Sequence, residues 1–286
     1  MSKSGTPHIE VQGIAVPALI YGTAWKEERT SALTHVALGE GFRAIDTANQ
    51  RRHYFEAGVG EAVAAFVQSG QVARSDLFLQ TKFTYVDGQD HRLPYDLAAP
   101  PRQQVVQSFE KSLEHLQTTT IDAYLLHGPS SGRGLSSQDW EVWRAMEDLR
   151  GEQRVSLLGI SNVSAEQLLA LLSECQVAPA FVQNRCYART GWDAAVRRLC
   201  TEHGVAYQGF SLLTANRREM TQPALTRIAR GCGRSPAQVV FRFAIQVGMI
   251  PLTGTTSSGH MREDLGCFDF ELNRKEVDSI EQIGVE

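Results

Sequence analysis

Eight short apolar runs, separated by longer amphipathic stretches, are the feature of this 286-residue chain that most constrains its fold. Each run is rich in β-branched or aromatic residues, which is typical of parallel strands buried on both faces. The pattern therefore predicts eight strands, at Ala18–Thr23, Arg43–Thr47, Leu77–Thr84, Ile121–His127, Val155–Asn162, Phe181–Tyr187, Ala206–Leu213 and Met249–Gly254.

The stretches between the runs have the apolar spacing of surface helices. Two of them begin with residues that satisfy the free N–H groups of a first helical turn, namely Ser164, and Ser235 followed by Pro236. The expected helices include Tyr54–Gln68, Arg102–Leu116, Ser137–Leu149, Ala165–Cys175, Trp192–His203, Ser235–Val247 and Asn273–Ile283.

Alternation of strands with helices over about 250 residues predicts parallel βα units, either closed as a (β/α)8 barrel or open as a doubly wound sheet. The number and even spacing of the strands favour the barrel. Gly22–Trp25 also lacks the GxGxxG pattern that follows the first strand of a dinucleotide-binding open sheet. Ile9–Val16 is typical of a hairpin that turns near Gly13 and covers the barrel bottom. We expect an α/β fold, a (β/α)8 TIM barrel with an N-terminal β-hairpin cap, in which residues 1–286 form a single domain.

Composition excludes several other classes of protein. Apolar residues make up 42% of the chain. There are 28 Lys and Arg against 32 Asp and Glu, which gives a formal charge of −4, so the chain has no overall electrostatic attraction to nucleic acid or to anionic membranes. No apolar run approaches the roughly 20 residues that span a bilayer, and the first residues lack the apolar stretch of a signal peptide. Five widely spaced cysteines without a CxxC pair argue against structural zinc or a disulfide framework. We expect a cytoplasmic enzyme without a metal site.

Three of the predicted strands carry an ionisable residue at or near their C-terminal end, namely Asp46, Lys82 and His127 on the second, third and fourth strands. Charged groups at the end of a buried run are costly unless they are paired. The C-terminal strand ends of a barrel meet at one rim, so we expect these side chains to lie together, with Lys82 and Asp46 as an ion pair. Tyr54 follows Asp46 closely in the sequence.

The motifs that contain these residues resemble those of the aldo-keto reductase family. Gly41–Ala48 resembles the family's strand-two motif, and Thr81–Lys82 resembles its strand-three motif. Leu125–Pro129 and Gly159–Asn162 resemble the motifs of strands four and five. The resemblance covers nearly the whole chain in the family's order, and it implies reduction of an aldehyde or a ketone to an alcohol.

The resemblance implies a catalytic tetrad of Asp46, Tyr54, Lys82 and His127. Hydride reduction of a carbonyl leaves negative charge on the oxygen, and Tyr54 would supply the proton that neutralises it. A free tyrosine has a pKa of ~10, and we expect the Lys82 ammonium, oriented by Asp46, to lower that value. A neutral His127 would donate a hydrogen bond to the carbonyl oxygen and orient it toward the hydride donor.

The position of Tyr54 departs from the family pattern. The family's tyrosine commonly lies five residues after the aspartate, whereas Tyr54 lies eight residues after Asp46. Counting back from Glu56, His53 falls where the tyrosine usually stands. The loop must bulge to present Tyr54, and if it does not, the alternative proton donors are Tyr85 and Tyr21.

The resemblance also implies an extended dinucleotide bound across the later strands. Ser161, Asn162 and Gln183 match positions that hold the nicotinamide carboxamide, and Phe210 matches an aromatic residue that stacks on the nicotinamide ring. The other positions at which the resemblance implies contact with the cofactor are Gly22, Thr23, Ser211, Leu213, Thr253, Gly254, Thr255, His260, Glu263 and Asp264.

The region expected around the 2′-phosphate of NADPH departs from the family as well. The family commonly places a lysine and an arginine there, whereas this chain has Leu252 and His260. Arg262 and nearby threonine and serine hydroxyls remain as binding groups, but charge-assisted contacts are the stronger kind. We therefore expect NADP(H) as the cofactor, with NAD(H) as the alternative and a weaker preference between them than is usual.

Trp25 and Tyr85 follow barrel strands and are expected to form walls of the substrate pocket. The long C-terminal tail of some family members has no counterpart after the last expected helix, so we expect that pocket to be open to varied small carbonyl compounds. The alternative to an enzyme is a nucleotide-binding, non-catalytic regulatory barrel that responds to the redox state. A metal-dependent hydrolase is disfavoured, because Lys82 between Asp46 and His127 would repel a cation. The sequence leaves the physiological substrate and the oligomeric state open.

Overall fold

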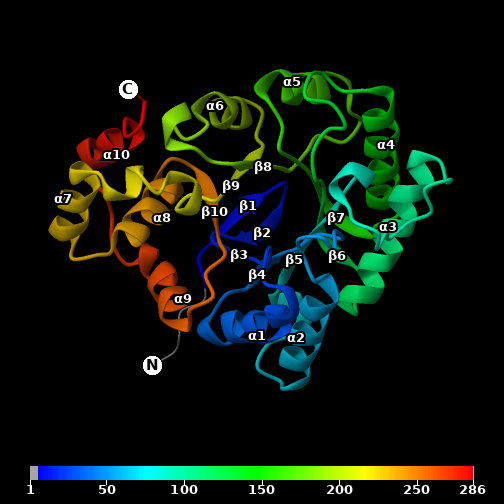
Figure 1. Cartoon of the computed structure of the whole chain (residues 1–286), viewed down its shortest axis with the longest axis horizontal. Helices are drawn as coiled ribbons and strands as arrows, with labels where there is room; N and C mark the ends of the chain where they lie inside the picture. Colours follow the sequence, from blue (N-terminus) through cyan, green and yellow to red (C-terminus); the bar gives the residue numbers. More distant parts are fainter. Residues whose placement is uncertain (1–5, 286) are drawn as a thin grey trace.

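The computed structural model describes residues 6–285, which contain a closed barrel of eight strands surrounded by helices (Figure 1). Neighbouring strands are parallel and follow one another in chain order, and the last strand closes onto the first. This confirms the predicted (β/α)8 barrel. The barrel strands are β3 (Ile20–Gly22), β4 (Ala44–Asp46), β5 (Phe78–Phe83), β6 (Ile121–Leu126), β7 (Val155–Ser161), β8 (Phe181–Arg185), β9 (Ala206–Phe210) and β10 (Met249–Thr253).

Several of the surrounding helices begin at a serine that caps them. Ser136, Ser164 and Ser235 each accept a hydrogen bond from the backbone N–H three residues later, which satisfies a free donor of the first turn. Helix α2 begins at Glu56 instead of Tyr54, so that tyrosine lies in the preceding loop. No helix within residues 6–285 combines the length and the apolar character needed to cross a membrane. The helices are α1 (Thr30–Glu40), α2 (Glu56–Gln68), α3 (Pro101–Leu116), α4 (Ser137–Gly151), α5 (Ala165–Glu174), α6 (Ala194–Glu202), α7 (Pro223–Cys232), α8 (Pro236–Gln246), α9 (Ser258–Leu265) and α10 (Arg274–Glu281).

Helices α1 and α7 are not among those expected from the sequence, whereas α9 lies in the segment that resembles the family's helix after the last barrel strand. Helix α1 has no side-chain cap at its start, and its apolar residues are not confined to one face, so it carries neither of the signals that indicate the other helices. Helix α7 does begin with a proline at the first helical position, but it has no side-chain cap, and in the sequence its arginines indicate no more than a solvated surface. Both omissions concern the outer layer of helices and leave the barrel unchanged.

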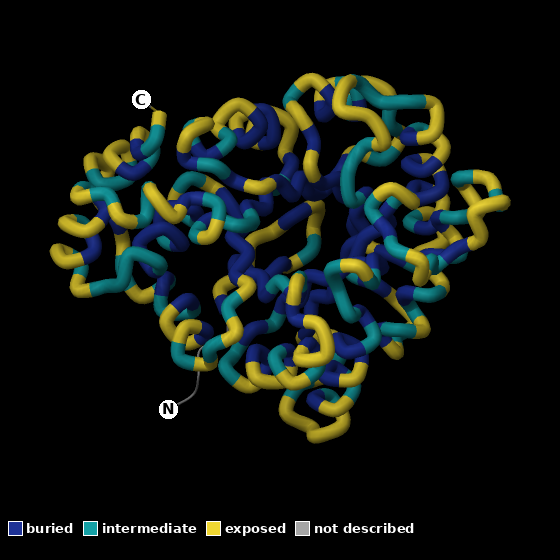
Figure 2. Tube along the Cα trace, viewed as in Figure 1, coloured by how far each residue is buried: buried dark blue, intermediate teal, exposed yellow. Residues whose placement is uncertain are grey.

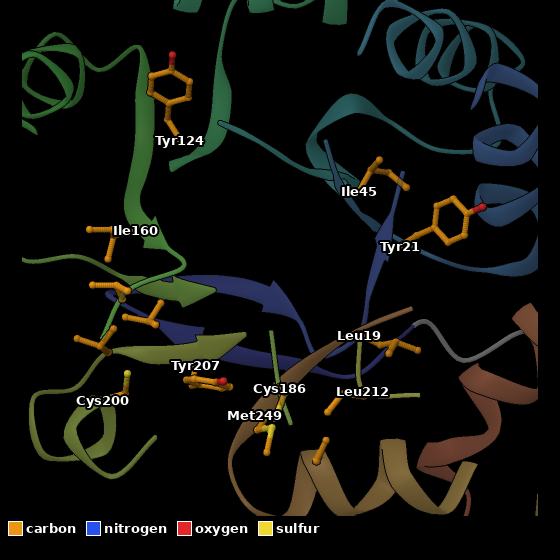
Figure 3. Close-up of a cluster of buried hydrophobic side chains, with 14 of the residues drawn as sticks. Leu19, Tyr21, Ile45, Tyr124, Ile160, Cys186, Cys200, Tyr207, Leu212 and Met249 are labelled. Atoms are coloured by element: carbon orange, nitrogen blue, oxygen red, sulfur yellow. The ribbon is translucent and has the colours of Figure 1, made fainter. Parts of the chain in front are cut away.

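Side chains alternate along each barrel strand between the interior and the layer of helices. On β4, Ala44 belongs to the interior apolar cluster, whereas Ile45 belongs to the cluster packed between strands and helices. Figure 3 shows part of that outer cluster. On β5, Phe78 is an interior residue, so Gln80 and Lys82 share its face. The strands themselves are buried, whereas exposure is concentrated in the loops and outer helix faces (Figure 2).

The bottom of the barrel is closed by the N-terminal hairpin, as predicted. Strands β1 (His8–Val11) and β2 (Ile14–Pro17) pair antiparallel, and Figure 1 shows them across the centre of the barrel. The turn is made by Gln12 and Gly13 with φ values of 47° and 81°, a conformation typical of two-residue hairpins. Val11 and Val16 of the hairpin join the interior apolar cluster. The barrel is therefore sealed with apolar side chains at one end and open only at the C-terminal ends of its strands.

Candidate active site

A cavity of about 1270 Å³ lies at the C-terminal ends of the barrel strands. Barrel enzymes carry their chemistry at this end, because the loops that follow the strands converge there. Lys82 and Thr23 are completely buried and lie behind the wall of the cavity. The wall contains the other residues proposed from the sequence, namely Gly22, Trp25, Asp46, Tyr54, Tyr85, His127, Ser161, Asn162, Gln183, Phe210, Ser211, Leu213, Thr253, Gly254, Thr255, His260, Glu263 and Asp264.

Lys82 and Asp46 form a buried ion pair at one end of this cavity. The Lys82 Nζ donates hydrogen bonds to both Asp46 carboxylate oxygens, at 2.6 and 2.7 Å, and to the Thr47 carbonyl oxygen at 2.8 Å. All three N–H groups of the ammonium are therefore used. Burial lowers the pKa of the Lys82 amine, and the contacts with Asp46 act in the opposite direction by favouring the charged form. The expected ion pair is present.

A tight turn in the loop between β4 and α2 accommodates the unusual spacing between Asp46 and Tyr54. The backbone N–H groups of His53 and Tyr54 both donate to the Gln50 carbonyl oxygen, at 3.1 and 2.9 Å. His53 consequently turns toward the cavity wall, where its ring lies 4.0 Å from that of Trp25, centroid to centroid. This turn is the bulge that the eight-residue spacing between Asp46 and Tyr54 requires. It leaves Tyr54 facing the ion pair.

Tyr54 lies beside the ion pair with its proton retained. Its ring centroid is 5.3 Å from the Lys82 Nζ and 5.9 Å from the His127 ring centroid. Because the ammonium donates all its hydrogens to Asp46 and Thr47, it does not hydrogen-bond the phenol oxygen. Burial raises the pKa of Tyr54 above its usual value of 10, and the charge of Asp46 adds to the effect. The expectation of a lowered pKa for Tyr54 is therefore wrong for this structure, since burial and the charge of Asp46 both raise it.

His127 is neutral, as expected. Burial lowers its pKa to about 3, and the positive charge of Lys82 acts in the same direction. The His127 Nδ1 lies 2.7 Å from the Thr84 hydroxyl. When the hydroxyl donates to Nδ1, the neutral ring carries its hydrogen on Nε2. His127 therefore has an N–H available as a donor at the cavity.

The two alternative proton donors are engaged elsewhere. The Tyr21 hydroxyl donates to the Thr255 carbonyl oxygen at 3.0 Å, and the Tyr85 hydroxyl donates to Asp139 at 2.8 Å. Burial raises the pKa of both phenols. By contrast, no group within residues 6–285 hydrogen-bonds the Tyr54 hydroxyl. Tyr54 is therefore the one of these three tyrosines whose hydroxyl remains free.

The residues expected to hold a carboxamide present oxygen atoms to the cavity. The Ser161 hydroxyl donates to the Gln183 carbonyl oxygen at 2.6 Å, and the Asn162 Nδ2 donates to the His127 carbonyl oxygen at 2.8 Å. The Gln183 Nε2 donates to Asp46 at 3.0 Å. Among the described residues, no donor reaches the side-chain oxygens of Asn162 and Gln183. Two amide acceptors without partners suit a ligand that offers an N–H₂ group.

Two threonines expected to face the cofactor use their hydroxyls within the protein. Thr23 donates to the Asp46 carbonyl oxygen at 2.9 Å and is completely buried, so the expectation that it faces a cofactor in this cavity is wrong. Thr253 lines the cavity but donates to the Asp264 carboxylate at 2.7 Å. Burial raises the pKa of Asp264 to about 6. Both contacts hold loop segments at the barrel rim, and neither hydroxyl hydrogen is free for a ligand.

The side chain of Arg262 turns away from the cavity. Its guanidinium pairs with Glu40 at 2.6 Å, and it is absent from the cavity wall, whereas Leu252 and His260 are part of the wall. Arg262 therefore does not replace the cations that the family commonly has in this region.

Two cations of the cavity wall are missing from the sequence-based prediction. Lys26, which follows β3, is 2% exposed, and its Nζ donates to the Gly254 carbonyl oxygen at 2.8 Å. Burial lowers the pKa of the Lys26 amine to about 8, and the charge of Arg29 adds to this effect. Arg185, the last residue of β8, lies with its guanidinium carbon 5.7 Å from the Phe210 ring centroid. Neither cation has a carboxylate partner in the part of the chain that the structure describes. Their places at or just after strand ends are the signal that could have identified them.

The open end of this (β/α)8 barrel brings a buried Asp–Lys pair, a free tyrosine and a neutral histidine to a cavity of about 1270 Å³. This arrangement is that of an oxidoreductase of the barrel type. The chain matches the model of the Aldo/keto reductase family over residues 18–285 and belongs to that family.

Relatives of known name are consistent with this assignment. The chain is 28% identical to "Uncharacterized oxidoreductase YtbE" of Bacillus subtilis, over 97% of this chain and 94% of that protein. It is 28% identical to "Glyoxal reductase" of the same organism, over 95% of this chain and 90% of that protein. The solved structure of the Bombyx mori aldo-keto reductase AKR2E4 in complex with NADP superposes with a TM-score of 0.82 at 25% identity, covering 99% of this chain and 94% of that one.

Proposed function

We propose that this chain, acting as a single barrel domain, reduces aldehydes or ketones to alcohols with NADPH as the hydride donor and Tyr54 as the proton donor. The observation that carries the proposal is the Tyr54 hydroxyl, which is free of partners among residues 6–285, lines the cavity, and belongs to a ring beside Lys82 and His127. A small carbonyl compound is the substrate.

The cavity wall fits an extended nicotinamide dinucleotide. The side-chain oxygens of Asn162 and Gln183 would accept from the carboxamide, and Phe210 would pack against the nicotinamide ring. Lys26 and Arg185 supply positive charge for the pyrophosphate. When bound, the reduced nicotinamide supplies the hydride that is added to the carbonyl carbon. The other proposed contacts of the cofactor are Gly22, Ser161, Ser211, Leu213, Thr253, Gly254, Thr255, His260, Glu263 and Asp264.

Burial keeps the proton on Tyr54 at neutral pH, although the raised pKa also makes the phenol a weaker acid. A phenol that keeps its proton at neutral pH is ready to donate it, and an alkoxide is a stronger base than a phenolate, so the transfer is downhill. The ammonium of Lys82 faces the ring and favours the negative charge that Tyr54 acquires as the proton leaves. In the oxidative direction the same residue would have to act as a base, for which this environment is unfavourable.

His127 orients the substrate. Its Nε2–H would donate to the carbonyl oxygen, and because the imidazole is neutral it does not compete with Tyr54 as a proton source. Trp25 and Tyr85 also line the cavity and offer it aromatic surface, which suits carbonyl compounds with an apolar or aromatic body.

Substitution of Tyr54 by phenylalanine tests the proposal. Tyr54→Phe keeps the ring and removes the proton donor, so kcat for reduction of a generic aromatic aldehyde should fall about 10²–10⁴-fold, while the Kd for NADPH stays within about twofold. Loss of NADPH absorbance follows turnover, and fluorescence titration follows binding. Tyr207→Phe is the matched control, because the Tyr207 hydroxyl donates to Asp193 in the outer layer.

Two results would contradict the proposal. Full activity of Tyr54→Phe would exclude Tyr54 as the donor. Binding of NADPH by the unmodified protein without turnover of any aldehyde or ketone would instead favour the non-catalytic, nucleotide-binding barrel.

A further inference from the structure

Three glutamines form a polar layer across the barrel interior, next to the Asp46–Lys82 pair. Gln80 on β5, Gln183 on β8 and Gln208 on β9 are all buried, and none is more than 3% exposed. Below them lies the apolar interior cluster that the hairpin seals. A buried amide is costly unless its hydrogen bonds are made, so side chains of this kind in a barrel core require partners.

The partners are Asp46 and the other glutamines. Asp46 Oδ1 accepts from Gln80 Nε2 at 2.6 Å and from Gln183 Nε2 at 3.0 Å, in addition to the Lys82 ammonium. Gln80 and Gln183 each also donate to the Gln208 side-chain oxygen, at 2.8 and 2.9 Å. The Gln208 Nε2 donates back to Gln80 Oε1 at 2.9 Å. All the amide hydrogens of Gln80 and Gln183 are therefore used.

The carboxylate dictates the orientation of the three amides. An ionised carboxylate only accepts hydrogen bonds, so Gln80 and Gln183 must both turn their N–H₂ groups toward Asp46. Gln208 must then present its oxygen to their remaining hydrogens. Gln183 is left with its own oxygen without a donor among residues 6–285, at the cavity wall. Reversal of any one amide would place two donors or two acceptors face to face.

We infer that Gln80 is a positioning residue of the reaction that acts through Asp46, and that Gln208 connects it to Gln183. Gln80 fixes the direction of the carboxylate and, through it, the place of the Lys82 ammonium that faces the Tyr54 ring. The same network fixes the amide oxygen that Gln183 presents to the nicotinamide carboxamide. The inference rests on the proposed function and deepens it, because it adds a positioning residue of the barrel core to the proton-donor site.

Gln80→Met tests the inference, because it keeps the length of the side chain and removes its hydrogen bonds. We expect kcat to fall about tenfold, while the KM values for NADPH and aldehyde stay within about twofold, since Gln183 keeps its bonds to Asp46 and Gln208. An unchanged kcat would overturn the inference.

The pH profile of Gln80→Met gives a second readout. Its alkaline limit for kcat should move to lower pH, because a less firmly held carboxylate stabilises the Lys82 ammonium less. An unchanged profile would overturn the inference. The charged and titratable groups that face Lys82 are Asp46, Glu56, Tyr54 and His127, and all four are left in place by this substitution.

A double-mutant cycle tests whether Gln80 acts through Asp46. In an Asp46→Asn background the carboxylate charge is gone, so adding Gln80→Met should change kcat by less than about threefold. A tenfold loss in both backgrounds would show that the effect does not pass through Asp46 and would overturn the inference.

Gln167→Met separates positioning from loss of stability. Gln167 is also 3% exposed and donates two hydrogen bonds, both at 2.9 Å, to the Ser131 and Gly134 carbonyl oxygens. It lies outside the cavity wall, so its loss should lower the melting temperature and leave kcat and the pH profile unchanged. If Gln80→Met behaves in the same way, Gln80 has only a structural role and the inference is overturned.

If Gln80→Met does not fold, Gln80→Glu takes its place. The introduced carboxyl group can donate to Asp46 while it is neutral, and it repels Asp46 once it is ionised. The kcat of Gln80→Glu should therefore be retained at low pH and lost as pH rises, and a profile like that of the unmodified protein would overturn the inference. Absence of turnover by the unmodified protein is a separate result, because it contradicts the proposed function itself.

Discussion

The two ends of the cavity are built in different ways. At the proposed catalytic end (Asp46, Tyr54, Lys82 and His127), the ion pair and the imidazole stand on or just after barrel strands and have fixed protein partners. The basic groups proposed to bind the cofactor phosphates (Lys26, Arg185 and His260, here called the phosphate end) come from loops, strand tips and the start of a helix, and none has a carboxylate partner within residues 6–285.

This difference in partners predicts which substitutions affect kcat and which affect cofactor binding. Preorganised groups in a buried site cost little reorganisation when charge develops, so their displacement affects the reaction itself. Cations without a carboxylate partner are available to a ligand phosphate, so their removal should affect binding more than the fold. Substitutions at the catalytic end should therefore reduce both stability and kcat, and substitutions at the phosphate end should change only the cofactor constants.

The largest effect should follow from Lys82→Met. This change leaves the Asp46 carboxylate buried without its cation, which should lower the free energy of unfolding by about 3–5 kcal/mol. It also removes the charge that favours ionisation of Tyr54, so kcat should fall at least about 10²-fold. Denaturant unfolding and NADPH turnover measure the two effects separately.

A second substitution at the same pair separates the loss of stability from the loss of kcat. Lys82→Met combined with Asp46→Asn removes the uncompensated charge, so much of the lost stability should return while kcat stays low. A single variant as stable as the unmodified protein would mean that the pair is not held as the structure has it, and the contrast between the two ends would fail.

The sequence predicts the catalytic end better than the phosphate end, and the reason is strand geometry. Asp46 and Lys82 end buried runs in which alternation fixes the facing side, so their meeting at one rim follows from the pattern. Tyr54 is harder to place, because its position depends on the turn closed at the Gln50 carbonyl oxygen. Lys26 lies in a loop, where no period indicates which way a side chain points.

The glutamine layer escapes the sequence-based prediction for a different reason. The sequence-based prediction of the site depends on charged residues at strand ends, whereas Gln80 is neutral and lies within an apolar run. Its spacing of two residues from Lys82 places both side chains on the same face, which is a readable signal. Helices are predictable where caps and one-sided apolar spacing agree, so α1, which lacks both, escapes the pattern.

An intermediate effect is expected from Lys26→Met. The pKa of Lys26 is lowered to about 8, and only the protonated amine attracts phosphate, so NADPH affinity should weaken as pH rises from about 7 to about 9. Lys26→Met should raise the Kd for NADPH about tenfold at neutral pH and remove this inflection, with kcat little changed. Fluorescence titration across this pH range is the measurement.

The matched control for Lys26 is Lys275→Met, since Lys275 is an exposed lysine of α10 outside the cavity wall. It should leave the Kd for NADPH and its pH dependence unchanged. Equal behaviour of the two variants would show that Lys26 does not contact the cofactor, and that the phosphate end lies elsewhere.

The smallest effect concerns the choice between NADPH and NADH. Leu252 is apolar and Arg262 is paired with Glu40, so His260 is the basic side chain in this region of the wall that could contact a 2′-phosphate. The ratio of kcat/KM for NADPH to kcat/KM for NADH should therefore be less than about ten. His260→Arg introduces a guanidinium that is charged at every accessible pH and binds phosphate through two N–H groups. It should raise the ratio of the two kcat/KM values several-fold, about 1 kcal/mol, through the KM for NADPH alone.

If His260→Arg leaves this ratio unchanged, the 2′-phosphate lies away from α9. A strong preference for NADPH in the unmodified protein would mean that Lys26 or Arg185 already supplies the missing charge.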